Sequence, residues 1–354
     1  FTEPSPVVDL EAEYVGVTSV ILKWAVNDST SDSYTYRIEV VNGTKRNLTS
    51  NDTKAEITEL IPGTMYTFTV FAVAADNETE GEGVSIDRYT KPSPVVDLEA
   101  EYVGVTSVIL KWAVNDSASD SYTYRIEVVN GTKRNLTSND TKAEITELIP
   151  GTMYTFTVFA VAADNKTEGE GVSIDRYTKP SPVVDLEAEY VGVTSVILKW
   201  AVNDSTSDSY TYRIEVVNGT KRNLTSNDTK AEITELIPGT MYTFTVFAVA
   251  ADNKTEGERG SIALYTKPSP VVDLEAEYVG VTSVILKWAV NDSASDSYTY
   301  RIEVVNGTKR NLMSNDTKAE ITELIPGTMY TFTVFAVAAD NKTEGEGASI
   351  FQYT

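Results

Sequence analysis

Apolar and polar residues alternate along the chain in short segments that polar turns separate. Val20, Leu22 and Trp24 share one phase, and Tyr36 and Ile38 begin another alternation of the same kind. A period of two places successive side chains on opposite faces of a strand, whereas an amphipathic helix needs apolar residues at i, i+3 and i+4. That helical spacing is missing, so the pattern predicts strands with one buried face and requires no helix.

About seven strands are expected in the first ninety residues, and turn residues separate them. The expected strands are centred on residues 8–12, 20–24, 34–40, 48, 55–57, 65–74 and 84–86. Asn42-Gly43 between two alternating segments is a strong hairpin signal, and residues 27–33 and 76–83 form polar loops. Many short strands with frequent turns indicate an all-β fold, a seven-stranded β-sandwich with Greek-key connections.

The same pattern occurs four times. Trp24, Trp112, Trp200 and Trp288 are spaced by 88 residues, and almost every residue between them recurs at the same offset. Solenoid repeats have periods of about 20–50 residues, so this period instead indicates a small autonomous domain. Four tandem domains are therefore predicted, at residues 4–91, 92–179, 180–267 and 268–354.

Two aromatic positions in each repeat are expected to be structural. Trp24 is in phase with the buried face of its strand. Tyr66 follows the Pro62-Gly63 corner, where a sandwich tyrosine commonly hydrogen-bonds back to the chain, the tyrosine corner. The expected structural residues are Trp24, Tyr66, Trp112, Tyr154, Trp200, Tyr242, Trp288 and Tyr330.

These residues resemble the signature of the fibronectin type III domain. The resemblance rests on Leu22-Lys23-Trp24, Leu60-x-Pro62-Gly63-x-x-Tyr66 and the closing Tyr89-Thr90, and it covers all four repeats. The phrase 58–63, the junction at 89–93 and the density of Asn-x-Ser/Thr sites are also similar to ectodomains of type III receptor protein tyrosine phosphatases. This second resemblance implies the extracellular part of a single-pass receptor whose catalytic phosphatase domain lies outside the chain.

The composition and net charge of the chain exclude several kinds of functional site and partner. The chain has neither cysteine nor histidine, which excludes thiolate chemistry, histidine-dependent catalysis and the common zinc sites. The net charge of −23 repels phosphate backbones and anionic lipid, so we expect no nucleic-acid partner and membrane attachment only through a segment outside this chain. We expect no catalytic residues, cofactor or metal, since the acidic loops match no calcium-ligand spacing and are expected to be solvated.

The junctions between repeats are short and rich in proline. Residues 91–94 read Lys-Pro-Ser-Pro, and two prolines in four residues favour an extended, semi-rigid connector. At about 3.3 Å per residue, the strand expected at 65–74 makes a domain roughly 33 Å long. Four such domains in line predict a rod of order 130 Å.

The recurring chemistry is N-glycosylation. The asparagines fall in five slots per repeat, and all but Asn311 open an Asn-x-Ser/Thr sequon. A preference of asparagine for turns explains some positions but not the hydroxyl residue two places on. The candidate acceptors are Asn42, Asn47, Asn77, Asn130, Asn135, Asn165, Asn218, Asn223, Asn253, Asn306 and Asn341. An acidic middle residue disfavours transfer at Asn27, Asn51, Asn115, Asn139, Asn203, Asn227, Asn291 and Asn315.

None of these sequons falls on the first, second or fifth expected strand. Those three strands would form one sheet, so its outer face should remain free of sugar and available for a protein partner. The residues expected on that face are Asp9, Glu11, Glu13, Ile21, Lys23 and Glu56.

The sequence therefore predicts a non-enzymatic, glycosylated spacer and recognition segment on the extracellular side of the plasma membrane, or secreted. Its partners would be an extracellular protein ligand or a neighbouring receptor, with N-linked glycans attached. The alternative is a purely structural spacer of an adhesion or matrix protein without a dedicated ligand. Array domains of secreted carbohydrate-active enzymes and cytosolic muscle-type arrays have no reason to keep dense sequons.

Overall fold

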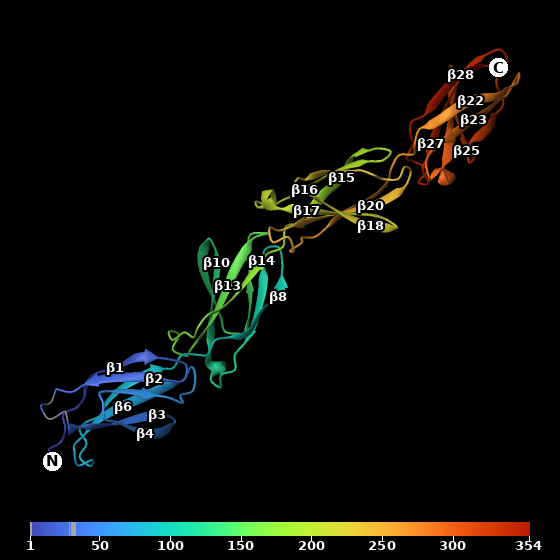
Figure 1. Ribbon diagram of the computed structural model, residues 1–354. Coiled ribbons are helices and arrows are strands. Elements are labelled where there is room, and N and C mark those ends of the chain that lie inside the picture. Colours follow the sequence, from blue (N-terminus) through green and yellow to red (C-terminus); the bar gives the residue numbers. More distant parts are fainter. Residues whose placement is uncertain (1, 28, 30–32) are drawn as a thin grey trace. The chain divides into compact units, whose positions relative to one another are not determined.

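Each repeat folds into two antiparallel sheets, one of three strands and one of four (Figure 1). The structure, a computed structural model, describes residues 2–27, 29 and 33–354. The first repeat contains β1 (Val8–Val15), β2 (Val20–Ala25), β3 (Thr35–Asn42), β4 (Thr44–Ser50), β5 (Lys54–Ile57), β6 (Met65–Val73) and β7 (Val84–Tyr89). The expected all-β sandwich is confirmed, and the weak segment around residue 48 is a full strand.

The other repeats reproduce this order of strands. The second contains β8 (Val96–Val103), β9 (Val108–Ala113), β10 (Thr123–Asn130), β11 (Thr132–Ser138), β12 (Lys142–Ile145), β13 (Met153–Val161) and β14 (Val172–Tyr177). The third contains β15 (Val183–Val191), β16 (Val196–Val202), β17 (Thr211–Asn218), β18 (Thr220–Ser226), β19 (Lys230–Ile233), β20 (Met241–Val249) and β21 (Gly260–Tyr265). The fourth contains β22 (Val271–Val279), β23 (Val284–Val290), β24 (Thr299–Asn306), β25 (Thr308–Ser314), β26 (Lys318–Ile321), β27 (Met329–Val337) and β28 (Ala348–Tyr353).

Short helical turns add to this pattern of strands in three repeats. Three-residue 3₁₀ helices form in the polar loop before the third strand of three repeats: η2 (Ser119–Ser121), η3 (Ser207–Ser209) and η4 (Ser295–Ser297). In η2 the hydroxyl of Ser121 donates to the carbonyl of Ala118 at 2.7 Å. Such turns are common connectors because short polar side chains satisfy the backbone locally.

The two sheets of the first repeat have the orders β1-β2-β5 and β4-β3-β6-β7. The first, second and fifth strands therefore do form one sheet, as the sequence predicts. Alternation in β3 buries Tyr36, Ile38 and Val40, and the same alternation in β6 buries Phe68 and Val70. The apolar phases of the two sheets face each other and close the core.

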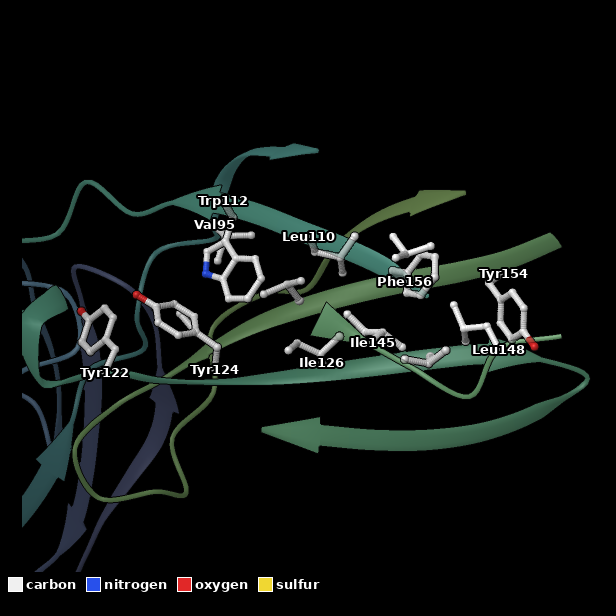
Figure 2. Packing of buried hydrophobic residues seen from close by; sticks show 14 residues of the cluster. Val95, Leu110, Trp112, Tyr122, Tyr124, Ile126, Ile145, Leu148, Tyr154 and Phe156 are labelled. Atoms are coloured by element: carbon white, nitrogen blue, oxygen red, sulfur yellow. The ribbon is translucent and has the colours of Figure 1, made fainter. Parts of the chain in front are cut away.

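The tryptophan with its neighbouring tyrosine and the corner tyrosine lie toward opposite ends of that core (Figure 2). Trp24 is 3% exposed and meets the ring of Tyr36 edge-on, with centroids 5.2 Å apart. Figure 2 shows the equivalent cluster of the second repeat, in which Trp112 faces Tyr124 and Tyr154 lies beside Leu148. Aromatic pairs in this geometry add stability beyond the apolar area that they bury.

The corner before β6 is fastened by side chains. The backbone N–H of Ile61 donates to the Tyr66 hydroxyl at 2.9 Å, and Gly63 takes the positive φ of +60° that the turn requires. Thr90 is fully buried, and its hydroxyl donates to the carbonyl of Ile61 at 2.6 Å. The same corner recurs in the later repeats, where the backbone N–H groups of Ile237 and Ile325 donate to tyrosine hydroxyls at 2.9 Å.

Candidate functional site

The candidate acceptor asparagines lie on the four-stranded sheet or on loops at the ends of the sandwich. Asn27 follows β2, Asn42 ends β3, Asn47 lies within β4, Asn51 follows β4, and Asn77 lies in the loop after β6. The equivalent asparagines of the later repeats occupy the same strand positions. β1, β2 and β5 carry none of them.

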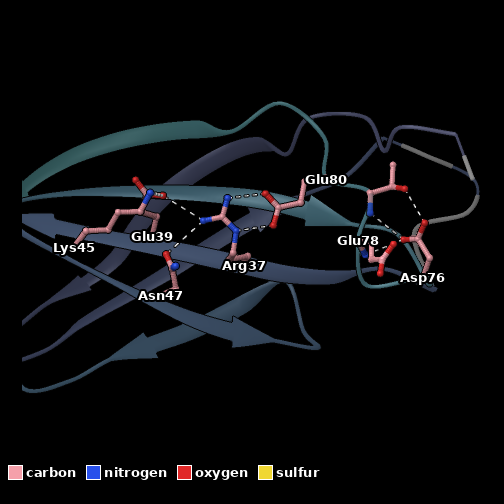
Figure 3. Close-up of polar contacts among 8 residues, drawn as sticks. Arg37, Glu39, Lys45, Asn47, Asp76, Glu78 and Glu80 are labelled. Atoms are coloured by element: carbon pink, nitrogen blue, oxygen red, sulfur yellow. Dashed lines mark hydrogen bonds and ion pairs between the residues drawn. The ribbon is translucent and has the colours of Figure 1, made fainter.

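The loop after β6 uses its sequon residues for its own structure. Asn77 has a φ of +58°, a left-handed conformation that asparagine tolerates better than most residues. The backbone N–H and the hydroxyl of Thr79 donate to the Asp76 carboxylate at 3.0 and 2.7 Å, and the N–H of Glu78 also donates, at 3.1 Å (Figure 3). These hydrogen bonds, led by the backbone N–H of Thr79, lower the pKa of Asp76 to about 2.

A charged cluster surrounds the sequon on β4. The Arg37 guanidinium makes two hydrogen bonds of 2.6 Å to the Glu80 carboxylate and lies 3.9 Å from the ring centre of Phe71. Its third nitrogen donates to the Asn47 side-chain oxygen at 3.4 Å and to Glu39 at 3.2 Å (Figure 3). The hydrogen bonds from Arg37 hold the pKa of Glu80 below its usual value. The basic residues of this surface are thus paired with acids on the same sheet.

Asn311 shows what the side-chain amide at this position does in a repeat that has no sequon there. It opens no sequon, because Met313 stands where the other repeats have threonine. Its side-chain oxygen nevertheless accepts a hydrogen bond from Arg301 at 3.2 Å. An asparagine in this slot therefore has a use in the fold without any glycan.

The outer face of the three-stranded sheet is charged and carries none of the candidate acceptors. Asp9, Glu11, Glu13, Lys23 and Glu56 are exposed, and Ile21 is half-buried. The Lys54 ammonium contacts the Glu13 carboxylate, and this hydrogen bond lowers the pKa of Glu13.

Sequence reasoning missed one residue of this face, Tyr14. Strict alternation from Ala12 would point Tyr14 into the core, but the register of β1 against β2 shifts between these two residues. The bulge places Glu13 and Tyr14 together on the outside, and Tyr14 is 52% exposed opposite Ile21. The signal was present in Val15, an apolar residue that lies out of phase with Ala12 and packs against the core. All four repeats expose this tyrosine.

The fourth repeat differs on its four-stranded sheet. Met313 and Phe351 are 60% and 70% exposed and occupy positions where the first repeat has Thr49 and Asp87. In the first repeat the Thr67 hydroxyl donates to Asp87 at 2.6 Å, a bond that phenylalanine cannot accept. The last repeat thus gains apolar surface where it loses a sequon.

Within residues 2–27, 29 and 33–354, no cluster of acidic side chains has the arrangement of a metal site. Across the same described residues, none of the helices has the length and hydropathy needed to span a bilayer.

Comparison with known proteins accounts for this architecture. The family model of the fibronectin type III domain matches residues 4–86, 91–174, 179–262 and 267–351. The chain belongs to the fibronectin type III family. It consists of four such domains, which confirms the resemblance seen in the sequence.

Receptor-type tyrosine-protein phosphatase eta of Gallus gallus is 67% identical over 358 residues, covering 100% of this chain and 26% of that protein. The Homo sapiens protein of the same name is 32% identical, covering 96% of this chain and 25% of that protein. Tenascin-R of Gallus gallus is 25% identical, covering 86% of this chain and 22% of that protein. The chain is thus homologous to a fibronectin type III region and spans about a quarter of each relative's length.

Proposed function

We propose that the chain is a non-catalytic extracellular segment of a cell-surface receptor, glycosylated on its four-stranded sheets and loops. The proposal is supported by the 67% identity, over the whole chain, to a receptor-type tyrosine-protein phosphatase. Any phosphatase domain of the parent protein would lie outside this segment. The domain boundaries that follow from the repeat are residues 4–91, 92–179, 180–267 and 268–354.

The segregation of the sequons carries the proposal. A glycan on β4 or on the loops would shield the four-stranded sheet and the ends of each sandwich, while the outer face of the three-stranded sheet stays bare. That bare face presents an exposed tyrosine among charged side chains, a composition suited to protein contact. Proline-rich junctions would hold successive domains apart, so the segment would act as both spacer and recognition surface.

A first experiment tests the shielding. The chain is secreted from animal cells, and hydroxyl-radical labelling is compared before and after enzymatic removal of N-glycans. Labelling of Phe71, on the outer side of the four-stranded sheet, should increase on deglycosylation, whereas labelling of Tyr14 should not change. An increase at Tyr14 as large as that at Phe71 would contradict a bare three-stranded sheet.

A second experiment tests recognition by placing a new glycan on each face in turn. Glu11→Asn with Glu13→Thr creates a sequon on β1, and Ser85→Asn with Asp87→Thr creates a matched sequon on β7. Both pairs are exposed, so the fold should accept either. Binding of the secreted chain to animal cells should fall only when the glycan stands on β1. Equal binding by both variants would favour the alternative, a structural spacer without a dedicated ligand.

A further inference from the structure

The hairpin between β3 and β4 brings the two essential residues of one sequon side by side. Asn42 pairs directly with Thr44, and Gly43 alone spans the turn with a φ of +68°. Directly paired residues of an antiparallel ladder project to the same side. Asn42 is in phase with Val40, a buried residue, so both sequon side chains lie on the core-facing side of the sheet.

On that side the end of the sandwich is open. Asn42 and Thr44 line a pocket of about 210 Å³, together with Val40, Arg46, Ile61 and Tyr66. The same pocket, with equivalent lining residues, has a volume of about 240 Å³ in the third repeat and 230 Å³ in the fourth. It is therefore a property of the repeated hairpin and corner.

Among the described residues, neither the Asn42 amide nor the Thr44 hydroxyl has a hydrogen-bond partner, although both border a pocket. The loop after β6 is the opposite case, because there Thr79 binds Asp76 and Asn77 supplies the left-handed turn. Local structure thus explains both residues of the sequon at Asn77. At Asn42 the hairpin explains the asparagine and leaves the Thr44 hydroxyl without a local role.

The walls of the pocket have a mixed character. Ile61 is 43% exposed and, with Val40, gives an apolar surface. Arg46 donates to the carbonyl of Thr58, and its guanidinium lies 3.8 Å from the Glu59 carboxylate. Apolar walls with a few fixed polar groups suit a ligand that has apolar C–H faces and hydroxyl or amide edges, as a pyranose with an acetamido group has.

We propose that the first sugars of an N-glycan on Asn42 fold back into this pocket and close the open end of the core. Their C–H faces would cover Ile61 and Val40, and their polar groups would reach Arg46 and Glu59. The same seat would serve Asn218 and Asn306 in the later repeats. This inference rests on the glycosylation proposed above and adds that one class of glycan is part of the folded domain.

The test measures the effect of the same substitutions in a glycosylated and in an unglycosylated protein. Asn42→Gln, Asn130→Gln, Asn218→Gln and Asn306→Gln are combined in the full chain, which is made both in animal cells and, without glycans, in bacteria. In the glycosylated protein the thermal midpoint should fall by at least about 2 °C, since about 1 kcal/mol shifts a domain of this size by roughly 4–8 °C. In the bare protein the same substitutions should leave the midpoint unchanged.

The matched control removes the neighbouring glycan instead. Thr49→Met, Thr137→Met and Thr225→Met abolish the sequons on the fourth strand of the first three repeats. Methionine is the residue that the fourth repeat carries at this position, as Met313. These substitutions should change the thermal midpoint by the same amount in the glycosylated and in the bare protein. A glycan in the pocket should also be released more slowly from Asn42 than from Asn77 by N-glycanase acting on the native protein.

Glycopeptide mass spectrometry separates the two proposals. If no sequon is occupied, both the glycosylation and the seat are wrong. If the other sequons carry glycans and Asn42 does not, only the seat is wrong. Two further outcomes would contradict only the packing of the glycan in the pocket. In the first, Asn42 is occupied but the glutamine variant loses equal stability with and without glycans. In the second, the glycan is released from Asn42 as fast as from Asn77.

Discussion

Replacing the corner tyrosine with phenylalanine isolates a single hydrogen bond. In Tyr66→Phe the ring keeps its place, 7% exposed and stacked on Phe68 with centroids 6.0 Å apart. Only the hydroxyl is lost, and with it the acceptor of the Ile61 N–H at 2.9 Å. No cavity of methyl size opens, so the change measures the tyrosine corner and little else.

The expected cost follows from the donor left behind. Leaving a partly buried N–H without an acceptor costs at most about 1–3 kcal/mol, and the phenol no longer has to be desolvated, which offsets part of this. We therefore expect each repeat to lose about 1–2 kcal/mol of unfolding free energy. For a domain of this size the thermal midpoint should fall by roughly 4–16 °C.

The assay uses urea unfolding of the full chain, followed by the fluorescence of the core tryptophans. Because near-identical repeats unfold over the same range, the substitution is made at all four corners: Tyr66, Tyr154, Tyr242 and Tyr330. The chain offers a matched control in Tyr14, Tyr102, Tyr190 and Tyr278, which are more than half exposed. Changing these four to phenylalanine removes the same number of hydroxyls from the surface and should leave the urea midpoint within error.

The reasoning fails if the corner variant and the surface variant unfold at the same urea concentration. A change below about 0.5 kcal/mol per repeat would mean that water or relaxed backbone satisfies the Ile61 N–H, and that the corner is fastened by Thr90 alone.

Three further outcomes are expected. Because the folded pKa of Asp76 is depressed to about 2, its contribution to stability is complete above about pH 4 and is lost as the pH falls toward 2; Asp76→Asn at this position in every repeat should flatten that part of a thermal-midpoint profile. Arg37→Lys gives up the two-bond contact with Glu80 and should cost about 1 kcal/mol in urea unfolding, while equal stability would show that a point charge suffices. Met313→Thr restores a sequon at Asn311, and glycopeptide analysis of the secreted protein should find one additional glycan.

The strands were predictable because period two records directly which side chains the core accepts, and their division into two sheets followed from the resemblance to the fibronectin type III domain. Trp24 and Tyr66 were predictable for the same reason, since each stands at a fixed place in that alternation. The outward position of Tyr14 was not, because a bulge in β1 inverts the phase after Ala12. A bulge depends on the pairing of two strands, and alternation within one strand cannot locate it.

The surface chemistry was harder to predict because it joins residues far apart in the sequence. Arg37 and Glu80 are 43 residues apart, and they meet because β3 pairs with β6 and the segment after β6 returns to form the bridge between Val73 and Glu80. The pocket beside Asn42 likewise needs the corner before β6 to lie against the β3–β4 hairpin. Such contacts follow from the packed sheets and have no local pattern.

The structure shows which sequon residues also have a role in the fold, and therefore which sequons would be expected without glycosylation. At Asn77 the asparagine and the threonine both serve the turn, so their presence there would be expected without any glycan. At Asn311 the amide retains its hydrogen bond after the hydroxyl residue has gone, so that slot also has a structural use. At Asn42 the asparagine suits the hairpin turn with Gly43, whereas the paired Thr44 hydroxyl borders a pocket and has no hydrogen-bond partner in the described chain. This hairpin therefore adds local support to the glycosylation proposal, which rests on the segregation of the sequons over the sandwich.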